Sequence, residues 1–357
     1  MNGSLTTLVT IIATGAAAFA LNLVIIPVVL FISHERGWYD TNEDRKIHTE
    51  DTPRLGGIGF YISFILLTII GAEVVHGGES ESITVEFLPI FIGLTIVFLM
   101  GLFDDFRSLS PQLKFFLQAL AAAVVTTGSF VIDEISVPMS NGTLEFGWFA
   151  YPLTVLWIVS LINAVNFIDG MDGLAGGTVA IAAFFTAVLG VVLEQPAVAV
   201  ASIALFGATV GFLVFNLPPA KLFMGDSGSC TLGFLLAVFP LMGGGMEATG
   251  IGLVPTLTLL FVPLLDTVAA ILRRIRKGVP IYQPDSDHLH HKLLRLGFST
   301  GRILAIVYGA GLLSGLASLS WILLSGFARS GIVIAFWTLV LIGFLVLHWA
   351  RYAKVPQ

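Results

Sequence analysis

The chain has 357 residues, of which 56% are hydrophobic and 11% charged, and its formal net charge is −6. Soluble domains use roughly 25% charged residues, so this composition excludes an ordinary soluble protein and indicates an integral membrane protein. The single cysteine, Cys230, excludes an intrachain disulfide.

Apolar runs follow one another along the whole sequence, many of them near the ~20 residues that cross a bilayer as a helix. The short alternating segments of a membrane barrel are not seen. We therefore predict one all-α polytopic membrane domain over residues 1–357, with eleven transmembrane helices. The predicted helices cover residues 5–31, 57–75, 87–103, 112–130, 148–164, 174–193, 197–215, 228–242, 250–272, 301–325 and 330–349.

Two segments carry further local signals. The first apolar run has no basic residue before it, which favours a retained membrane helix over a cleaved signal peptide. Residues 131–147 place an Asn-Gly pair between β-prone residues, which predicts a small hairpin on the outer side.

The positive charges select one face of the membrane. The loops at 32–56, 104–111, 165–173, 216–227 and 273–300 alternate along the chain, so they share a face. All but Arg329 of the 17 lysines and arginines lie on that face or at its helix ends. Because positive loops stay in the cytoplasm, we predict that this face is cytoplasmic, with the N-terminus outside and the C-terminus inside.

The stretch "LINAVNFIDGMDGLAGG", residues 161–177, places polar side chains at the end of an apolar run. Asn163, Asn166, Asp169 and Asp172 follow at intervals of three, so on one helix they would form a single stripe. An acid facing lipid near the bilayer centre costs about 2.5–3.5 kcal/mol. We therefore expect these acids to face a wet cavity and a cation; the alternative is a solvated loop at a helix end.

Two other cytoplasmic loops carry acids. Asp104 and Asp105 are adjacent, and Lys114 comes within reach if the chain folds back at Pro111. Asp226 stands among glycines before an apolar run, where a phosphate or metal could approach the backbone of a helix N-terminus. Both features are also typical of plain helix caps.

The loop 273–300 combines basic residues and histidines. Four basic residues within 273–277 are followed by His288, His290 and His291. Without cysteine ligands, and beside an arginine-rich run, this cluster favours phosphate over zinc. The basic run alone could be a topogenic signal, which leaves the histidines unexplained. Asp266, near the end of its helix, is expected to pair with a nearby arginine.

Acids, bases and histidines on one face fit a phosphate ligand bridged by a metal. Carboxylates would hold the cation, and basic side chains the outer phosphate oxygens. The apolar body would accommodate a lipid tail.

The ordered motifs "RKIH…PRLGG", "FDD", "NAVNFIDGMDGL", "FMGDSGS" and "PDSDHLHH" closely resemble those of the polyprenyl-phosphate N-acetylhexosamine-1-phosphate transferases. The resemblance implies a multi-pass enzyme of the inner (plasma) membrane whose active site lies on the cytoplasmic face. Undecaprenyl phosphate would attack UDP-N-acetylglucosamine, giving undecaprenyl-diphospho-N-acetylglucosamine and UMP. The form of the HLHH loop is similar to the UDP-N-acetylglucosamine branch; the phospho-N-acetylmuramoyl-pentapeptide transferases are the alternative.

The resemblance also assigns residues. Asn166 and Asp226 match Mg²⁺ ligands, with Mn²⁺ as a substitute ion, and Asp172 and Phe223 match uracil-contacting positions. We predict four catalytic residues, Asp104, Asp105, Asp169 and His288. The resemblance adds Lys114, Arg274, His290 and His291 as substrate-binding residues, and we also predict Lys46 and Asn163 in that role.

The chemistry leaves two routes open. A phosphate monoester has its second pKa near 6, so at pH 7 a lipid phosphate is mostly dianionic and needs no strong base. We favour direct attack, with Asp104 or Asp105 orienting the acceptor or taking a residual proton, while a covalent aspartyl intermediate stays open.

Two alternative functions lie outside this family: a membrane transporter and a scaffold without catalytic activity. A metal or anion transporter should have polar residues at the midplane of several helices, whereas here the polar residues gather at one end of the helices. A catalytically silent scaffold would not need the intact motifs.

We expect membrane lipids as partners and no nucleic acid. The downstream glycan, O-antigen or teichoic acid among others, stays open, as does a homodimer packed through glycine-rich helices such as residues 309–315.

Overall fold

The computed structural model describes residues 2–39, 52–75, 86–136, 143–242, 251–280 and 287–350. The sequence predicted a single domain; the contacts divide the chain into two units, Met1–Gly252 and Leu253–Gln357. Each unit is described by itself. Lys46 lies outside the described residues, as does the Asn-Gly pair of the predicted hairpin.

The first unit is built from apolar helices. They are α1 (Asn2–Arg36), α2 (Gly57–Val75), α4 (Leu88–Phe106), α5 (Pro111–Thr126), α6 (Ala150–Ile168), α7 (Leu174–Val192), α8 (Pro196–Asn216) and α9 (Gly225–Val238), with short 3₁₀ turns at Gly147–Phe149 and Phe239–Leu241. Two of them, α5 and α8, begin at a proline, because the first helical turn needs no N–H donor there. Ser110 caps α5 by accepting a hydrogen bond from the Leu113 N–H.

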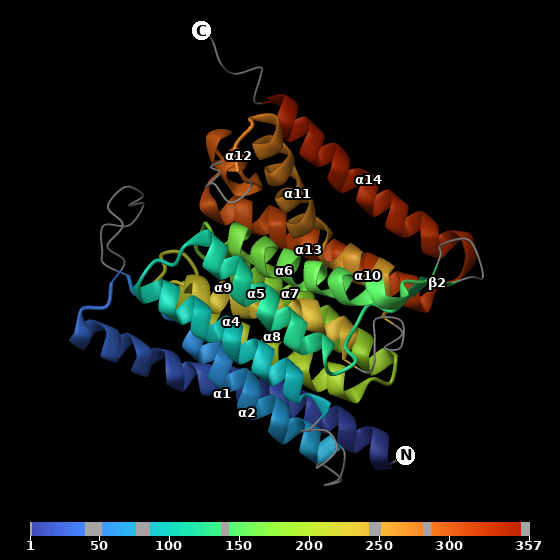
Figure 1. Ribbon diagram of the computed structural model, residues 1–357, viewed down its shortest axis with the longest axis horizontal. Helices are drawn as coiled ribbons and strands as arrows, with labels where there is room; N and C mark the ends of the chain where they lie inside the picture. The colour runs from blue at the N-terminus through green and yellow to red at the C-terminus, as the bar shows by residue number, and fades with distance from the viewer. Residues whose placement is uncertain are drawn as a thin grey trace. The chain divides into compact units, whose positions relative to one another are not determined.

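Helix α9 forms the core of this unit. All of its residues from Ser227 to Val238 are buried, and it contacts α2, α4 and α6 (Figure 1). A helix that is apolar on every side must be covered by other helices. The beginning of α9 is therefore held at the ends of α2, α4 and α6, where the polar loops lie.

Small residues let the other helices approach closely. α8 contacts α1, α2 and α7, and Figure 1 shows α1 and α2 side by side. A Cβ on Gly207 would collide with the carbonyl oxygen of Gly15. Asn22, fully buried, donates from Nδ2 to Ser63 Oγ at 2.7 Å and so ties α1 to α2. In a membrane, close backbone contacts and interhelical hydrogen bonds of this kind hold helices together, because hydrophobic burial does not drive their association there.

Two short strands pair between α5 and α6. β1 (Glu134–Ser136) runs antiparallel to β2 (Thr143–Glu145), with Ile135 opposite Leu144. They lie in the segment 131–147 for which the sequence predicts a hairpin. The side of the membrane on which it lies stays a prediction.

The second unit consists of α10 (Leu253–Leu259), α11 (Phe261–Arg276), α12 (Leu289–Arg295), α13 (Thr300–Leu323) and α14 (Gly326–Ala350), and α13 contacts the other four helices (Figure 1). The predicted single helix 250–272 is wrong, because α10 and α11 bend by 77° at their junction. Pro263 lies in the first turn of α11, where a helix tolerates proline, so a new helix starts there.

The all-α membrane fold is confirmed in its coarser form. Among the described residues, eight helices are long and apolar enough to cross a membrane, or nine if the bent pair counts as one span. α5 and α9 are shorter than that criterion requires. The total of eleven spans and the sides of the two termini are therefore not confirmed.

Candidate active site

The ends of two distant loops pair along their backbones in the first unit. The Phe223 N–H donates to the Pro53 carbonyl at 2.8 Å, and the Gly56 N–H donates to the Phe223 carbonyl at 3.1 Å. These bonds join the end of loop 32–56 to loop 216–227 and fix the backbone of Phe223, whose ring is half-buried.

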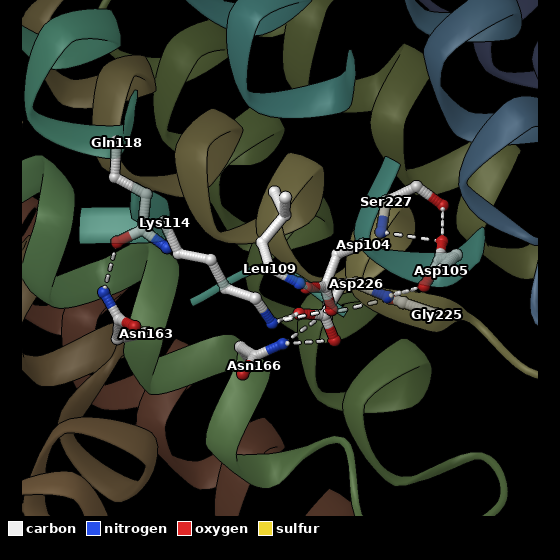
Figure 2. Close-up of polar contacts among 11 residues, drawn as sticks. Asp104, Asp105, Leu109, Lys114, Gln118, Asn163, Asn166, Gly225, Asp226 and Ser227 are labelled. Carbon is white, nitrogen blue, oxygen red and sulfur yellow. Dashed lines mark hydrogen bonds and ion pairs between the residues drawn. The ribbon is translucent and has the colours of Figure 1, made fainter. Parts of the chain in front are cut away.

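Asp105 holds the beginning of α9. Its Oδ1 accepts the Asp226 N–H at 2.6 Å, and its Oδ2 accepts the Ser227 N–H at 3.1 Å and the Ser227 hydroxyl at 2.5 Å (Figure 2). The first N–H groups of a helix have no partner inside it, so Asp105 caps α9 from another helix. A Cβ on Gly101, one turn earlier, would meet the backbone of Asp226 and Ser227, so glycine permits this approach.

Asp104 points to a different partner. Its Oδ1 accepts the Leu109 N–H at 2.7 Å, and its Oδ2 lies 2.6 Å from Lys114 Nζ. Lys114 Nζ also lies 2.7 Å from Asp226 Oδ2, so one ammonium bridges two carboxylates (Figure 2). The sequence indicated that Lys114 would come within reach if the chain folded back at Pro111, and the structure shows this contact with Asp104.

Asn166 completes the surroundings of Asp226. Its Nδ2 lies 3.2 Å from Asp226 Oδ1 and 2.9 Å from Ser229 Oγ. Exchanging the amide oxygen and nitrogen by a half-turn would present the Asn166 carbonyl oxygen to a cation beside Asp226. Among the described residues there is no group of three His, Cys, Asp or Glu side chains that could hold a metal. The donor set nevertheless fits Mg²⁺, which uses one or two carboxylates together with phosphate oxygens and water.

The predicted stripe of four polar residues is wrong as a helical feature. α6 ends at Ile168, so Asn163 and Asn166 lie on the helix, whereas Asp169 and Asp172 lie in the following turn. Asn163 donates to Gln118 Oε1 at 2.7 Å, toward α5, and has no hydrogen bond to Asp226.

The two acids of this turn have different surroundings. Asp172 Oδ2 accepts the Ala220 N–H at 3.0 Å, which joins the turn to the loop that carries Phe223. Burial and then the Asp226 carboxylate raise the pKa of Asp169 to about 7, while Arg54 opposes the shift. A carboxyl that titrates near neutrality can hold or release a proton.

The sequence reasoning did not find Asn216. This side chain is buried at the last position of α8, where its Oδ1 accepts the Gly173 N–H at 3.0 Å and its Nδ2 donates to the Leu222 carbonyl at 2.8 Å. It therefore fixes the turn of Asp172 to the loop of Phe223. The available signal was a lone amide at the end of an otherwise apolar helix.

The histidines and Arg274 lie in the second unit. Asp266 lies 2.9 Å from His288 Nδ1, so the expectation that it pairs with an arginine is wrong. His290 is 2% exposed, and its ring is tilted by 40° relative to the ring of His291, with 4.1 Å between the centroids. Burial and then the neighbouring His291 and His288 lower the pKa of His290 to about 3, against an opposing effect of Asp266.

Four of the five predicted loops thus meet in the first unit, through the contacts of Pro53, Asp105, Asn166 and Asp226. Asp104, Lys114 and Ser227 belong to the same cluster. The arrangement places carboxylates and one ammonium around the N-terminus of a buried helix, which suits a phosphate ligand with a bound cation. The position of the histidine loop relative to this cluster stays a prediction.

Comparisons with known proteins agree with this chemistry. Residues 87–244 match the family described as "Glycosyl transferase family 4". The probable undecaprenyl-phosphate N-acetylglucosaminyl 1-phosphate transferase of Bacillus subtilis (strain 168) is 33% identical over 297 residues, covering 83% of this chain and 81% of the relative. The decaprenyl-phosphate N-acetylglucosaminephosphotransferase of Mycobacterium leprae (strain TN) is 33% identical, covering 74% and 72%. A phospho-N-acetylmuramoyl-pentapeptide-transferase of Listeria welshimeri is 28% identical, covering 86% and 97%.

The similarity extends over most of the chain and includes the helices that carry the cluster around Asp226. The chain therefore belongs to the polyprenyl-phosphate N-acetylhexosamine-1-phosphate transferases and is an enzyme of this phosphotransferase class.

Proposed function

We propose that this enzyme transfers N-acetylglucosamine-1-phosphate from UDP-N-acetylglucosamine to undecaprenyl phosphate, at the cytoplasmic face of the inner (plasma) membrane. The products would be undecaprenyl-diphospho-N-acetylglucosamine and UMP. The observation that carries the proposal is the bridge from Asp104 through Lys114 to Asp226 at the beginning of α9. This site alternates negative and positive groups, as the meeting of two phosphates requires.

The names of the relatives favour this donor over its rival. The relatives from Bacillus subtilis and Mycobacterium leprae are named for N-acetylglucosamine transfer and are each 33% identical to this chain. The Listeria welshimeri relative, named for the muramoyl-pentapeptide substrate, is 28% identical. The sequence "HLHH" at 288–291 points to the same donor.

The residues of the cluster would divide the work of the transfer. A bound Mg²⁺ ion, held by Asp226 and Asn166, would supply positive charge to the diphosphate. Lys114 would contact phosphate oxygens, and Asp104, hydrogen-bonded to it, would orient the acceptor. An oxygen of the lipid phosphate would form a bond to the sugar-linked phosphorus while the bond from that phosphorus to the bridging oxygen breaks and UMP leaves.

The neighbouring loop would bind the nucleoside. Asp172 and Phe223 belong to segments that are joined by the hydrogen bond between Asp172 Oδ2 and the Ala220 N–H. The half-buried ring of Phe223 would stack on uracil, and Asp172 would contact its polar edge.

The test uses the purified full chain, labelled UDP-N-acetylglucosamine and undecaprenyl phosphate, with Mg²⁺ or with a chelator. We expect labelled sugar phosphate in the lipid fraction, equimolar UMP, and no transfer after chelation. UDP-N-acetylmuramoyl-pentapeptide in a parallel reaction should give none. Transfer from the pentapeptide nucleotide alone would establish the rival donor, and transport of an ion without UMP release would refute the enzyme assignment.

Asp226→Ala gives the matching prediction for the cluster. Removing the carboxylate should abolish Mg²⁺-dependent UMP release because Lys114 and Asn166 both lose their common partner. The melting temperature in detergent should stay near that of the unmodified chain, since the side chain of Asp226 is partly exposed. Undiminished turnover of this variant would refute the assignment of Asp226 as a metal ligand.

A further inference from the structure

Gln118 is a buried amide in α5 that the proposed reaction has not used. Its side chain belongs to a residue that is 2% exposed. After Lys114, α5 is apolar except for Gln118 and its last residue, Thr126. An amide that is buried away from water is costly unless it forms hydrogen bonds. The hydrogen bonds of Gln118 therefore indicate whether this side chain serves the fold or a ligand.

The contacts of Asn163 determine how the Gln118 amide is oriented. Asn163 Nδ2 donates to the Val159 carbonyl at 2.8 Å. The same nitrogen donates to Gln118 Oε1 at 2.7 Å (Figure 2). A backbone carbonyl can only accept, so the nitrogen of Asn163, and not its oxygen, must lie at this position. Because this nitrogen needs an acceptor, Gln118 presents its oxygen to Asn163 and turns its NH₂ group elsewhere.

The NH₂ group of Gln118 has two N–H donors to satisfy. Among the described residues, nothing accepts a hydrogen bond from Gln118 Nε2. Most buried polar atoms do form a hydrogen bond, and a buried donor without a partner destabilises the fold. The link between α5 and α6 uses the oxygen of Gln118 alone, so it does not explain the NH₂ group. Two unpaired donors at a buried position indicate a ligand that supplies acceptor oxygens.

The place of Gln118 in the fold brings these donors close to the charged cluster. Gln118 follows Lys114 by four residues on α5, and side chains at this spacing are neighbours, with Cβ atoms about 5–6 Å apart. Asn163 likewise precedes Asn166 by three residues on α6. The amide pair therefore lies one helical turn from Lys114 and Asn166, which both contact Asp226 (Figure 2).

This turn lies on the apolar side of the cluster. α5 begins beside the cluster, at Pro111, and continues away from it through apolar residues, while α6 runs toward the cluster and ends at Ile168. A water-soluble nucleotide would reach the cluster from the polar loops. The phosphate of a lipid would reach it from the apolar body, to which its chain is confined. The donors of Gln118 are therefore on the side of the acceptor.

We propose that Gln118 binds the acceptor: its NH₂ group donates hydrogen bonds to phosphate oxygens of the polyprenyl phosphate, while Asn163 holds its own oxygen. This inference deepens the proposed function and rests on it for the identity of the acceptor. It also gives Asn163 a positioning role, through Gln118, in place of the predicted direct contact with substrate. The neutral amide supplies hydrogen bonds without adding a second positive charge beside Lys114.

The test measures equilibrium binding of labelled undecaprenyl phosphate to the purified full chain in detergent, with no nucleotide present. Gln118→Leu removes both N–H donors, while Asn163 keeps the Val159 carbonyl as an acceptor. We expect about ten- to a hundred-fold weaker binding, as for lost hydrogen bonds to a charged group. Binding of undecaprenol, which has the same chain without the phosphate, should not change. Binding of UDP-N-acetylglucosamine, measured separately, should not change either.

Stability distinguishes this role from a structural one. Replacing an unpaired buried amide by an apolar side chain of similar size is close to neutral or stabilising. The melting temperature of Gln118→Leu should therefore equal that of the unmodified chain or exceed it. Gln118→Glu, measured at pH 8, keeps an oxygen for Asn163 and replaces the NH₂ group by a second oxygen, so it should also bind undecaprenyl phosphate more weakly. It provides the reading if the leucine variant does not fold.

Asn22→Leu is the matched control. Asn22 is also a buried amide that joins two helices of the first unit, through its hydrogen bond to Ser63. It links α1 to α2 and not α5 to α6. Its replacement should lower the melting temperature and leave the affinity for undecaprenyl phosphate unchanged.

The outcomes separate the two proposals. The role of Gln118 would be overturned by unchanged affinity for undecaprenyl phosphate in both variants, by an equal loss of undecaprenol binding, or by a loss confined to UDP-N-acetylglucosamine. A melting temperature of Gln118→Leu lowered as in Asn22→Leu would also overturn it, because the amide would then serve the fold. All of these results leave the proposed function in place. Transfer from the rival nucleotide alone would overturn the proposed donor, while the binding measurement, made without nucleotide, would still decide the role of Gln118.

Discussion

The adjacent acids Asp104 and Asp105 have different structural roles although they are neighbours in the sequence. Successive side chains on a helix point about 100° apart. Asp105 therefore faces the N-terminus of α9, where it accepts from the backbone of Asp226 and Ser227, while Asp104 faces Lys114. The resemblance treats both as one catalytic pair; the contacts separate a helix-capping acid from an acid beside the ammonium.

This separation predicts different effects of the same substitution. Asp105→Asn would place an amide NH₂ against fixed backbone N–H groups, and each lost hydrogen bond to a charged group costs about 1.5–3 kcal/mol. In Asp104→Asn the displaced partner is the flexible Lys114, which keeps Asp226. We expect a clearly lower melting temperature for Asp105→Asn, and mainly a lower rate of UMP release for Asp104→Asn.

Thermal melting in detergent and initial rates on the same preparations would compare the two variants. Equal melting temperatures would contradict the capping role of Asp105. Neither role could be predicted from "FDD", because the sequence shows two adjacent acids and not the backbone toward which each one turns.

His290 predicts a dependence of stability on pH. Its pKa is lowered to about 3 in the fold from an ordinary value of 6.5, chiefly by burial. Below pH 6.5 the unfolded chain binds a proton at this site and the folded chain does not until about pH 3. Stability is therefore lost as the pH falls through this range, by about 2 kcal/mol at pH 5.

Melting temperatures at pH 7.5 and pH 5 would measure this loss. His290→Gln should reduce the difference between the two pH values, whereas His34→Gln, which removes an exposed histidine of α1, should not. An unchanged pH dependence in His290→Gln would show that His290 is not buried as a neutral ring.

At the scale of elements, apolar length predicted helices well and their surroundings poorly. The predicted ranges 57–75 and 174–193 agree with α2 and α7 within one residue. The central position of α9 was not predicted, because a helix that faces lipid and one that faces other helices are equally apolar. The bend between α10 and α11 was missed for a similar reason: Pro263 is compatible with a continuous apolar run and with a new helix start.

The packing of α4 against the beginning of α9 can be tested with one methyl group. In Gly101→Ala the new Cβ would meet the backbone of Asp226 and Ser227, which cannot rotate away. Overpacking of this kind costs about 1–3 kcal/mol and would displace Asp226, so both the melting temperature and UMP release should fall.

Gly343→Ala in α14 is the matched control, because a Cβ there meets nothing within 4 Å. Alanine also favours a helix over glycine by about 1 kcal/mol, so this variant should be as stable as the unmodified chain or more so. Equal behaviour of the two alanine variants would mean that the approach of α4 to α9 is not tight.

At the scale of the whole molecule, the charge pattern and the observed contacts both indicate which loops share one side of the membrane. The sequence predicts that five loops share the cytoplasmic face, and in the described residues four of them are joined by hydrogen bonds around Asp226. Loops that touch must lie on one side of the membrane. The alternation of loops then fixes the parity of the helices between them, although composition alone could not show that α5 and α9 are short.

The remaining loop can be placed by cysteine labelling. Cys230 is buried, 1% exposed, so replacing it by alanine gives a background in which single exposed positions report their side. We expect Arg107→Cys, Gly170→Cys and Lys277→Cys to react with an impermeant maleimide only from the cytoplasmic side, and Trp148→Cys only from the outside. All four positions are exposed in the structure, so a lack of reaction reports the membrane and not burial. Labelling of Lys277→Cys from the outside would separate the histidine loop from the carboxylates and exclude a shared active site, while labelling of all four from one side would contradict the alternation on which the topology rests.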